Sequence, residues 1–200
     1  MLESRAAPCD ATDAKQLRAL AAPLLEPAKH LPHRRFFLGG SQYPADFPWT
    51  TNLFYLPHVA PPDHPAFYCS SRLTLNVTRA PMVETGWCPS GRIFEASACA
   101  TPVLSDVWSG IEDLFEPGKE ILLAHTTEEA IDWLSRPREE LASIGAAARR
   151  RTLFEHTGEI RARQLVDCLR QFSRLAAHTR LDPSVIRSSA NMRDTAPEVN

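Results

Sequence analysis

The 200-residue sequence has little glycine and no long apolar run, and each absence excludes a class of protein. Only 8 glycines stand beside 17 prolines, and no GxGxxG occurs, so the fingerprint of a dinucleotide-binding oxidoreductase is missing. No apolar run approaches the roughly 20 residues that a bilayer-spanning helix requires, and the first residues do not form a secretory signal. We therefore expect a cytoplasmic protein with no integral membrane segment.

Paired cysteines are missing as well. The 5 cysteines are scattered and lack the CxxC spacing of a zinc or redox site, so we expect reduced thiols. His30 and His33 form an H-x-x-H pair, but a structural zinc needs four ligands and no convergent third ligand is visible. We predict no metal and no resident cofactor. The sequence from Asn76 to Thr78 matches a glycosylation sequon, to which we assign no function without a secretory signal.

The chain also lacks a strong charge of one sign. Its formal net charge is -2, so no global field would draw it to nucleic acid or to an anionic membrane. A local cluster, Arg149 to Arg151 with Arg161 and Arg163, could face anionic lipid. Because Glu155 and Glu159 interrupt it, a solvated helix face is the favoured interpretation.

The hydrophobic fraction of 44% and the charged fraction of 23% are typical of one globular domain with tails. Residues 1–30 form a lead-in segment with one helix over Ala14–Ala22, because its apolar residues have helical spacing. Residues 31–178 form the domain. Residues 179–200 are polar and aperiodic, which predicts a disordered tail.

Within the domain, short apolar runs alternate with segments of helical pattern. The runs predict strands, which are Arg35–Leu38, Asn52–Leu56, Arg72–Val77, Pro102–Ser105 and Glu120–Ala124. The other segments predict helices, which are Pro62–Ser71, Gly91–Ala100, Gly110–Phe115, Thr127–Leu134, Pro137–Phe154 and Thr157–Leu175.

This alternation predicts an α/β fold with a Rossmann-like parallel sheet, helices on both faces and a helical C-terminus. The last helix carries five apolar residues at helical spacing, which we expect to face a core: Ile160, Leu165, Val166, Leu169 and Phe172. Trp49, Phe54 and Tyr55 could line an acceptor groove, and core or interdomain packing explains them equally well.

In open parallel sheets, ligands bind beyond the carboxyl ends of the strands, where loops lead into helix N-termini. Two loops have that position. The first, Val77 to Gly91, delivers the chain to a helix that Ser90 could cap and whose glycine start permits close approach of a phosphate. The second, Asp106 to Glu112, offers another helix start at Gly110 and Ile111, with Trp108 as a possible base or sugar platform.

Charged residues accompany the first loop. Arg79 and Arg92 could add positive charge to a diphosphate site. Glu95 lies one turn into the helix, and its side chain points back toward the N-terminal end, where a carboxylate could accept hydrogen bonds from ribose hydroxyls. From spacing alone, the alternative without phosphate binding remains: an ordinary helix that begins with glycine and carries a solvent-exposed glutamate.

The stretch LTLNVTRAPMVETGWCPSGRIFEASACATPVLSDVWSGIEDLFEPGKEILLA resembles the C-terminal region of CgeB-type spore-maturation glycosyltransferases, a branch of the GT-B superfamily. The resemblance extends over most of Leu31 to Leu175 and includes FLGGSQYPADFPW. It implies the C-terminal half of a GT-B fold, in which two Rossmann-like domains face across a cleft and the C-terminal one holds the nucleotide-sugar donor.

The resemblance also implies a set of donor-binding residues. Glu95 matches the acid of the family's R-x-F-E-A stretch, which contacts the donor ribose, and Arg92 and Gly91 match the start of that helix. The segment Gly110 to Glu112 matches the later donor-side loop, with Ile111 at its centre, and Arg79 is a candidate diphosphate contact. It assigns no catalytic residue.

Two positions depart from the family pattern. Ala100 stands where the family usually has glycine, which would stiffen the turn into the next strand. Related retaining transferases carry a second glutamate eight positions before the one matching Glu95, and that position is Trp87 in this chain. Sugar positioning by a carboxylate there is therefore not expected.

A complete GT-B enzyme needs an N-terminal acceptor domain, and we expect no counterpart of that domain in this sequence. We therefore predict a nucleotide-sugar-binding domain that is incomplete or needs a companion chain or a dimer for hexosyltransferase-like activity. The alternative is a non-catalytic Rossmann-like module that binds a nucleotide or a partner protein, with exposed apolar surface where the missing domain would lie.

Overall fold

The structure is a computed structural model that describes residues 26–40, 43, 47, 49–78 and 80–178. The chain divides into two units, residues 1–156 and 157–200. The expected lead-in helix over Ala14–Ala22 and the expected tail, residues 179–200, lie outside the described residues. The domain boundaries given above therefore stay a prediction.

The first unit contains a small parallel sheet of two strands, β1 (Phe36–Gly39) and β2 (Leu53–Leu56). Both strands were expected from their short apolar runs. The short helix α2 (Pro27–His30) precedes them. The buried Asn52 joins these parts, because its Nδ2 donates to the backbone carbonyls of Ala28, Leu31 and Arg34 at 2.9, 3.1 and 2.9 Å.

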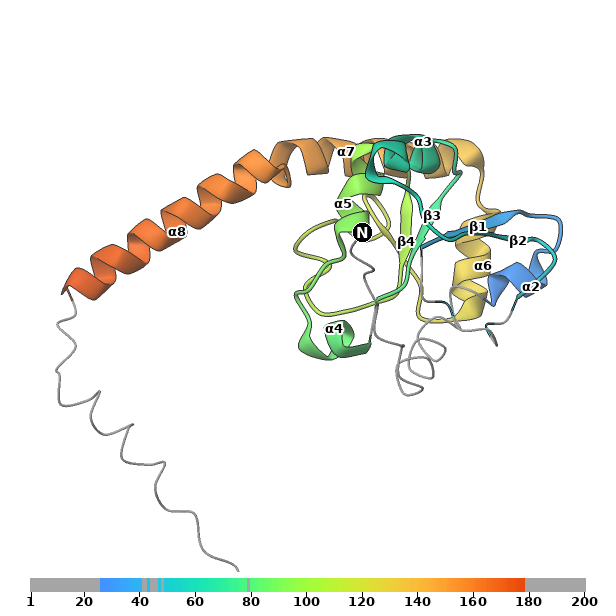
Figure 1. The fold of residues 1–200 in the computed structure, drawn as a ribbon, viewed down its shortest axis with the longest axis horizontal. Coiled ribbons are helices and arrows are strands. Elements are labelled where there is room, and N and C mark those ends of the chain that lie inside the picture. The colour runs from blue at the N-terminus through green and yellow to red at the C-terminus, as the bar shows by residue number, and fades with distance from the viewer. Residues whose placement is uncertain (1–25, 41–42, 44–46, 48, 79, 179–200) are drawn as a thin grey trace, which may run out of the picture. The chain divides into compact units, whose positions relative to one another are not determined.

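A second parallel sheet has the order β3-β4-β5, formed by Thr74–Asn76, Val103–Ser105 and Leu122–Leu123. Besides α2, the described part of this unit contains the helices η1 (Pro61–Asp63), α3 (His64–Cys69), α4 (Ala80–Thr85), α5 (Gly91–Ala98), α6 (Thr127–Ser135) and α7 (Arg138–Glu155). Parallel neighbours need crossover connections. Helices α4 and α5 lie in the connection from β3 to β4, whereas residues 106–121, which connect β4 to β5, form turns without a helix. The α/β fold with parallel strands flanked by helices is thus confirmed (Figure 1).

The central strand β4 divides the core between the two faces of its sheet. Val103 and Leu104 are both fully buried, yet they belong to different apolar clusters. Val103 packs in the cluster that contains Ile93 of α5, whereas Leu104 packs in the cluster that contains Leu134 of α6. Because successive side chains of a strand point to opposite faces, α5 and α6 cover opposite sides of the sheet.

Two segments differ from the sequence prediction. The connection expected as a loop from Val77 to Gly91 contains helix α4. The segment Gly110–Phe115, expected as a short helix, is a single turn in which the N–H groups of Leu114 and Phe115 both donate to the carbonyl of Ile111. The reason is local and tertiary: Gly110 has a φ of +97°, outside helical geometry, and burial of Ile111 and Phe115 fixes the turn.

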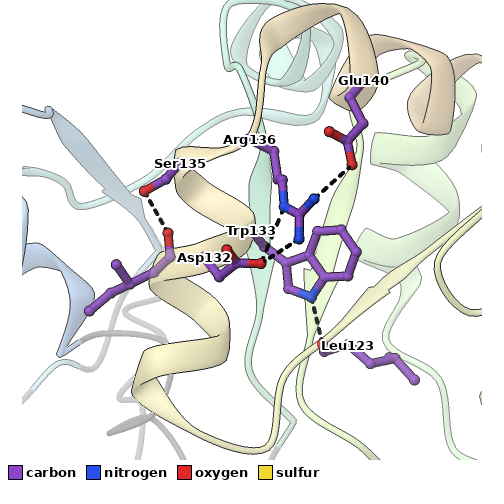
Figure 2. Close-up of polar contacts among 7 residues, drawn as sticks. Leu123, Asp132, Trp133, Ser135, Arg136 and Glu140 are labelled. Atoms are coloured by element: carbon purple, nitrogen blue, oxygen red, sulfur yellow. Dashed lines mark hydrogen bonds and ion pairs between the residues drawn. The ribbon is translucent and has the colours of Figure 1, made fainter.

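A polar cluster fixes the junction between α6 and α7 (Figure 2). The Nε1 of Trp133 donates to the carbonyl of Leu123 at 3.0 Å and ties α6 to β5. The Arg136 guanidinium lies 5.3 Å from the centre of the Trp133 ring and forms ion pairs with Asp132 and Glu140 at 2.8 and 3.7 Å. Arg136 therefore links the end of α6 to the start of α7, while Trp133 fixes α6 to the sheet.

The second unit contains helix α8 (Gly158–His178). The prediction that its apolar residues face a core is wrong for four of the five. Leu165, Val166, Leu169 and Phe172 are all exposed, with exposed fractions of 43% to 65%. Helical spacing reveals an apolar stripe, but it carries no information on what covers the stripe.

Candidate functional site

The carboxyl ends of β3 and β4 lie at one edge of the sheet, because the two strands are parallel and in register from Thr74 to Asn76. The chain leaves β3 toward α4, returns to begin α5, and later leaves β4 at Asp106. Figure 1 shows α4 beyond the ends of these strands. This edge is where ligands bind in open parallel sheets.

A buried polar cluster joins the two chain segments that leave the sheet. Asp106 accepts hydrogen bonds from the N–H and the hydroxyl of Thr78, at 3.0 and 2.7 Å, and from the hydroxyl of Ser105 at 3.2 Å. The Nδ2 of Asn76 donates to Ser105 Oγ at 2.9 Å. Burial raises the pKa of Asp106, and the hydrogen bonds from Thr78 oppose that shift. The cluster fixes where both loops start.

The same two loops meet again farther from the sheet. The N–H of Trp87 donates to the carbonyl of Ser109 at 2.8 Å. Gly86 and Gly110 have positive φ values of 65° and 97°, and Trp87 itself has a φ of 54°. The Trp87 ring lies so close to Gly110 that a Cβ there would be 2.6 Å from its Cδ2 atom. A side chain at position 110 would therefore displace the Trp87 ring, and the positive φ favours glycine there.

Helix α5 begins beside this junction. Ser90 stands at the N-cap with extended backbone, but its side chain makes no capping hydrogen bond. Gly91 is exposed, and a Cβ on it would meet nothing within 4 Å. Arg92 follows and is half-buried. An uncapped helix start with open space in front of it is suited to an anion, since free N–H groups and the helix dipole both favour negative charge.

Glu95 lies one turn into α5 and contacts α3. Its Oε2 is 3.1 Å from His64 Nδ1 and accepts a hydrogen bond from the Tyr68 hydroxyl at 3.4 Å. Burial, and next the charge of Glu95, raise the pKa of Tyr68, while Arg92 lowers it. The Glu95 side chain keeps an exposed fraction of 50%. Because a carboxylate has about four acceptor positions, Glu95 can still accept hydrogen bonds from a ligand.

His64 is held between two oxygen acceptors. Its Nε2 lies 3.1 Å from the carbonyl of Val59, and its Nδ1 faces Glu95. A neutral imidazole donates from only one nitrogen, so both contacts are satisfied by an imidazolium ion or by a protonated Glu95 carboxyl group. His64 therefore links the acid on α5 to the backbone at Val59.

The structure thus brings part of the expected site together. Gly91, Arg92 and Glu95 share α5, and Gly110 adjoins the segment that leads into it. Glu112 is exposed on the next turn, whereas the side chain of Ile111 is buried, which leaves only its backbone for a ligand. Arg79 lies outside the described residues.

The structure contradicts one expected ligand contact and adds four residues that the sequence did not assign to the site. Trp108 has an exposed fraction of 3% and packs in the core, so it cannot offer a ring face to a ligand. Sequence reasoning did not find the contacts of His64, Tyr68 and Asp106, because they join elements far apart in the chain. Trp87, which is exposed, could have been found from the sequence, because related retaining transferases carry a glutamate at its position, eight residues before the one matching Glu95.

Comparisons with known proteins agree with this architecture. Residues 16–167 match the family model described as glycosyl transferase-like. A search of the curated proteins found no match. In the described part of the chain, no helix has both the length and the apolar character needed to span a membrane.

Solved structures of low sequence identity share the fold. HepE from Anabaena, in complex with UDP-glucose, has 17% identity and a TM-score of 0.57, with 82% of this chain and 54% of that chain covered. Its complex with UDP and glucose has 18% identity and a TM-score of 0.58, with 80% of this chain and 52% of that chain covered. Sucrose-phosphate synthase from Thermosynechococcus elongatus has 17% identity and a TM-score of 0.62, with 79% of this chain and 43% of that chain covered.

The chain spans about half the length of these similar structures. They share the fold of this chain, in which parallel strands are flanked by helices. The family match extends over most of the 200 residues, from the segment before α2 into α8. The chain therefore belongs to the glycosyl transferase-like family.

Proposed function

We propose that this chain is the donor-binding half of a GT-B glycosyltransferase and binds a nucleotide sugar at the carboxyl edge of β3 and β4. The observation that carries the proposal is the start of α5, which has an uncapped N-terminus, open space at Gly91 and an acid one turn farther along. The finer resemblance to CgeB-type spore-maturation enzymes is part of the same proposal.

The diphosphate is assigned to the start of α5. The N–H groups of its first turn, the helix dipole and the adjacent Arg92 supply positive potential there, and Arg79 is a further candidate. We propose that these groups, rather than a resident metal, would stabilise the negative charge of the departing diphosphate. In a closed, water-excluded cleft, one such hydrogen-bond donor can lower the barrier by about 3 kcal/mol.

The ribose is assigned to Glu95. Its carboxylate is half-exposed. The backbone of Glu95 lies about 6 Å along the helix axis from that of Gly91, at the usual rise per residue. That distance suits a ribose hydroxyl next to a phosphate. Tyr68 and His64 hold the carboxylate in place, and Tyr68 is buried, so the acid is oriented before the ligand arrives.

Transfer would need a second domain to bind the acceptor and close the cleft. We propose that this domain is supplied by another part of the protein, by a companion chain or by a second copy. HepE structures hold UDP-glucose, or UDP and glucose, which makes these molecules suitable probes. We expect weak donor binding and negligible transfer by the 200-residue chain alone.

Calorimetry with UDP-glucose tests the proposal. We expect the chain to bind the ligand and Glu95→Ala to bind it about tenfold more weakly, because hydrogen bonds to a charged group contribute about 1.5 kcal/mol or more. Glu139→Ala is a matched control, since Glu139 is an exposed glutamate in the first turn of α7. Equal affinities for all three proteins would contradict the assignment of Glu95.

A non-catalytic interaction module is the second candidate, and one observation favours it. Phe37 and Phe54 lie side by side on the first sheet, with ring centroids 5.3 Å apart, and remain exposed by 53% and 44%. Stacked exposed aromatics are typical of a protein interface. If the chain binds no nucleotide but associates through this pair, the module hypothesis is favoured, and Phe37→Ser with Phe54→Ser should abolish that association.

A further inference from the structure

Trp87 combines exposure with a fixed position. Its exposed fraction is 66%, although a tryptophan side chain is largely apolar. The backbone N–H is bonded to Ser109, and the ring lies against Gly110, where a Cβ would be 2.6 Å from both Cδ2 and Cε3. One part of the ring is therefore backed by the glycine, and the large exposed fraction leaves the rest open to solvent.

The backbone of Trp87 is also in an uncommon conformation. Its φ of 54° is in the left-handed region, which bulky residues rarely adopt. Such a residue persists where surrounding structure fixes it, and here the hydrogen bond to Ser109 and the packing of the ring against Gly110 do so. An exposed aromatic ring held this way is preorganised for a flat apolar ligand face.

The order of residues along the chain indicates which part of a donor would reach this ring. A nucleotide sugar has the linear order base, ribose, diphosphate, sugar. Under the proposed function, the ribose lies at Glu95 and the diphosphate at Gly91. The sugar then extends beyond the start of α5, and residues 86–90 are the segment that leads into that start.

We propose that the exposed face of Trp87 receives the sugar ring of the donor, with the ring's C–H face packed on the indole. This inference rests on the proposed function and adds to it the residue that distinguishes a nucleotide sugar from a bare nucleotide. The sugar face is the apolar side of a hexose, and aromatic rings in binding sites pack against such faces.

The test compares two ligands on the 200-residue chain by calorimetry, UDP and UDP-glucose. Trp87→Ala should lower the affinity for UDP-glucose about fivefold, the size of effect expected for one lost aromatic contact, and should leave the affinity for UDP unchanged. Phe154→Ala is the matched control, because Phe154 is an aromatic residue of α7 exposed by 79%. It should change neither affinity.

Gly110→Ala provides an independent variant that keeps the tryptophan. Its new Cβ would displace the ring, so the same selective loss of UDP-glucose affinity is expected, with circular dichroism checking that the fold is retained. An unchanged affinity for UDP-glucose in Trp87→Ala, or an equal loss for both ligands, overturns the inference alone. Absence of UDP binding by the unaltered chain overturns the proposed function, and the inference with it.

Discussion

Gly145 of α7 lies directly on the backbone of Ala100, the residue that turns the chain from α5 toward β4. A Cβ at position 145 would overlap the carbonyl oxygen of Ala100 and lie 2.9 Å from its carbonyl carbon. Ala100 has a φ of 57°. The close approach of the two helices and the strained turn are thus one structural feature, and it supports the helix that carries the proposed site.

Replacing Gly145 tests this contact. Gly145→Ala should lower the free energy of unfolding by about 2 kcal/mol, because the overlap is with backbone atoms that cannot move aside, and this outweighs the gain in helix propensity of about 1 kcal/mol. Urea unfolding measures the change. Ser143→Ala, at an exposed position of the same helix, should be neutral or slightly stabilising. A Gly145→Ala protein as stable as the parent would show that α7 does not pack this closely.

Replacing Ala100 tests the turn itself. Ala100→Gly should raise the free energy of unfolding by about 0.5 kcal/mol, since relief of left-handed strain of about 1 to 2 kcal/mol exceeds the added entropy of the unfolded chain. Thermal unfolding should report a rise in Tm. As a contrast, Ala98→Gly, within α5, should lower it. A lower Tm for Ala100→Gly would mean that the residue is not strained.

The buried Asp106 predicts a pH dependence of stability. Burial raises its pKa above the ordinary 3.8, so the folded chain binds this proton more tightly than the unfolded chain does. The contribution is therefore fully present below pH 3.8 and is lost as the pH rises through the higher folded pKa. Asp106→Asn should remove that part of the pH slope.

Urea unfolding of both proteins at a series of pH values measures the effect of Asp106. The stability of the parent relative to Asp106→Asn should fall with rising pH and then level off. Asp113→Asn, at an exposed carboxylate in the neighbouring turn, should leave the parent's slope unchanged. A relative stability that rises with pH would mean that the hydrogen bonds from Thr78 outweigh burial.

The sequence predicted those parts of the fold whose signals are local. The apolar run Phe36–Leu38 ends at Gly39 and Gly40, and the strand ends there in the structure. The segment from Gly91 has helical spacing after a serine, and α5 begins at that glycine. Short-range chemistry decided these boundaries, so the sequence alone was sufficient.

The remainder depended on contacts between distant residues. The turn at Gly110 is not helical because Ile111 and Phe115 are drawn into the core, and Trp108 is buried in the same cluster. The partners of Glu95 come from α3, 31 and 27 residues earlier in the chain. No spacing rule could have assigned these contacts, because they exist only after the sheet has formed.

The central claim is that the first turn of α5 binds the diphosphate of a nucleotide sugar, and amide NMR tests it most directly. On addition of UDP to the 200-residue chain, the backbone signals of Gly91 and Arg92 should shift most, while those of Glu139 and Glu140, at the start of α7, should stay in place. Signals of α5 that do not move at saturating UDP, or shifts of equal size at both helix starts, would contradict the account.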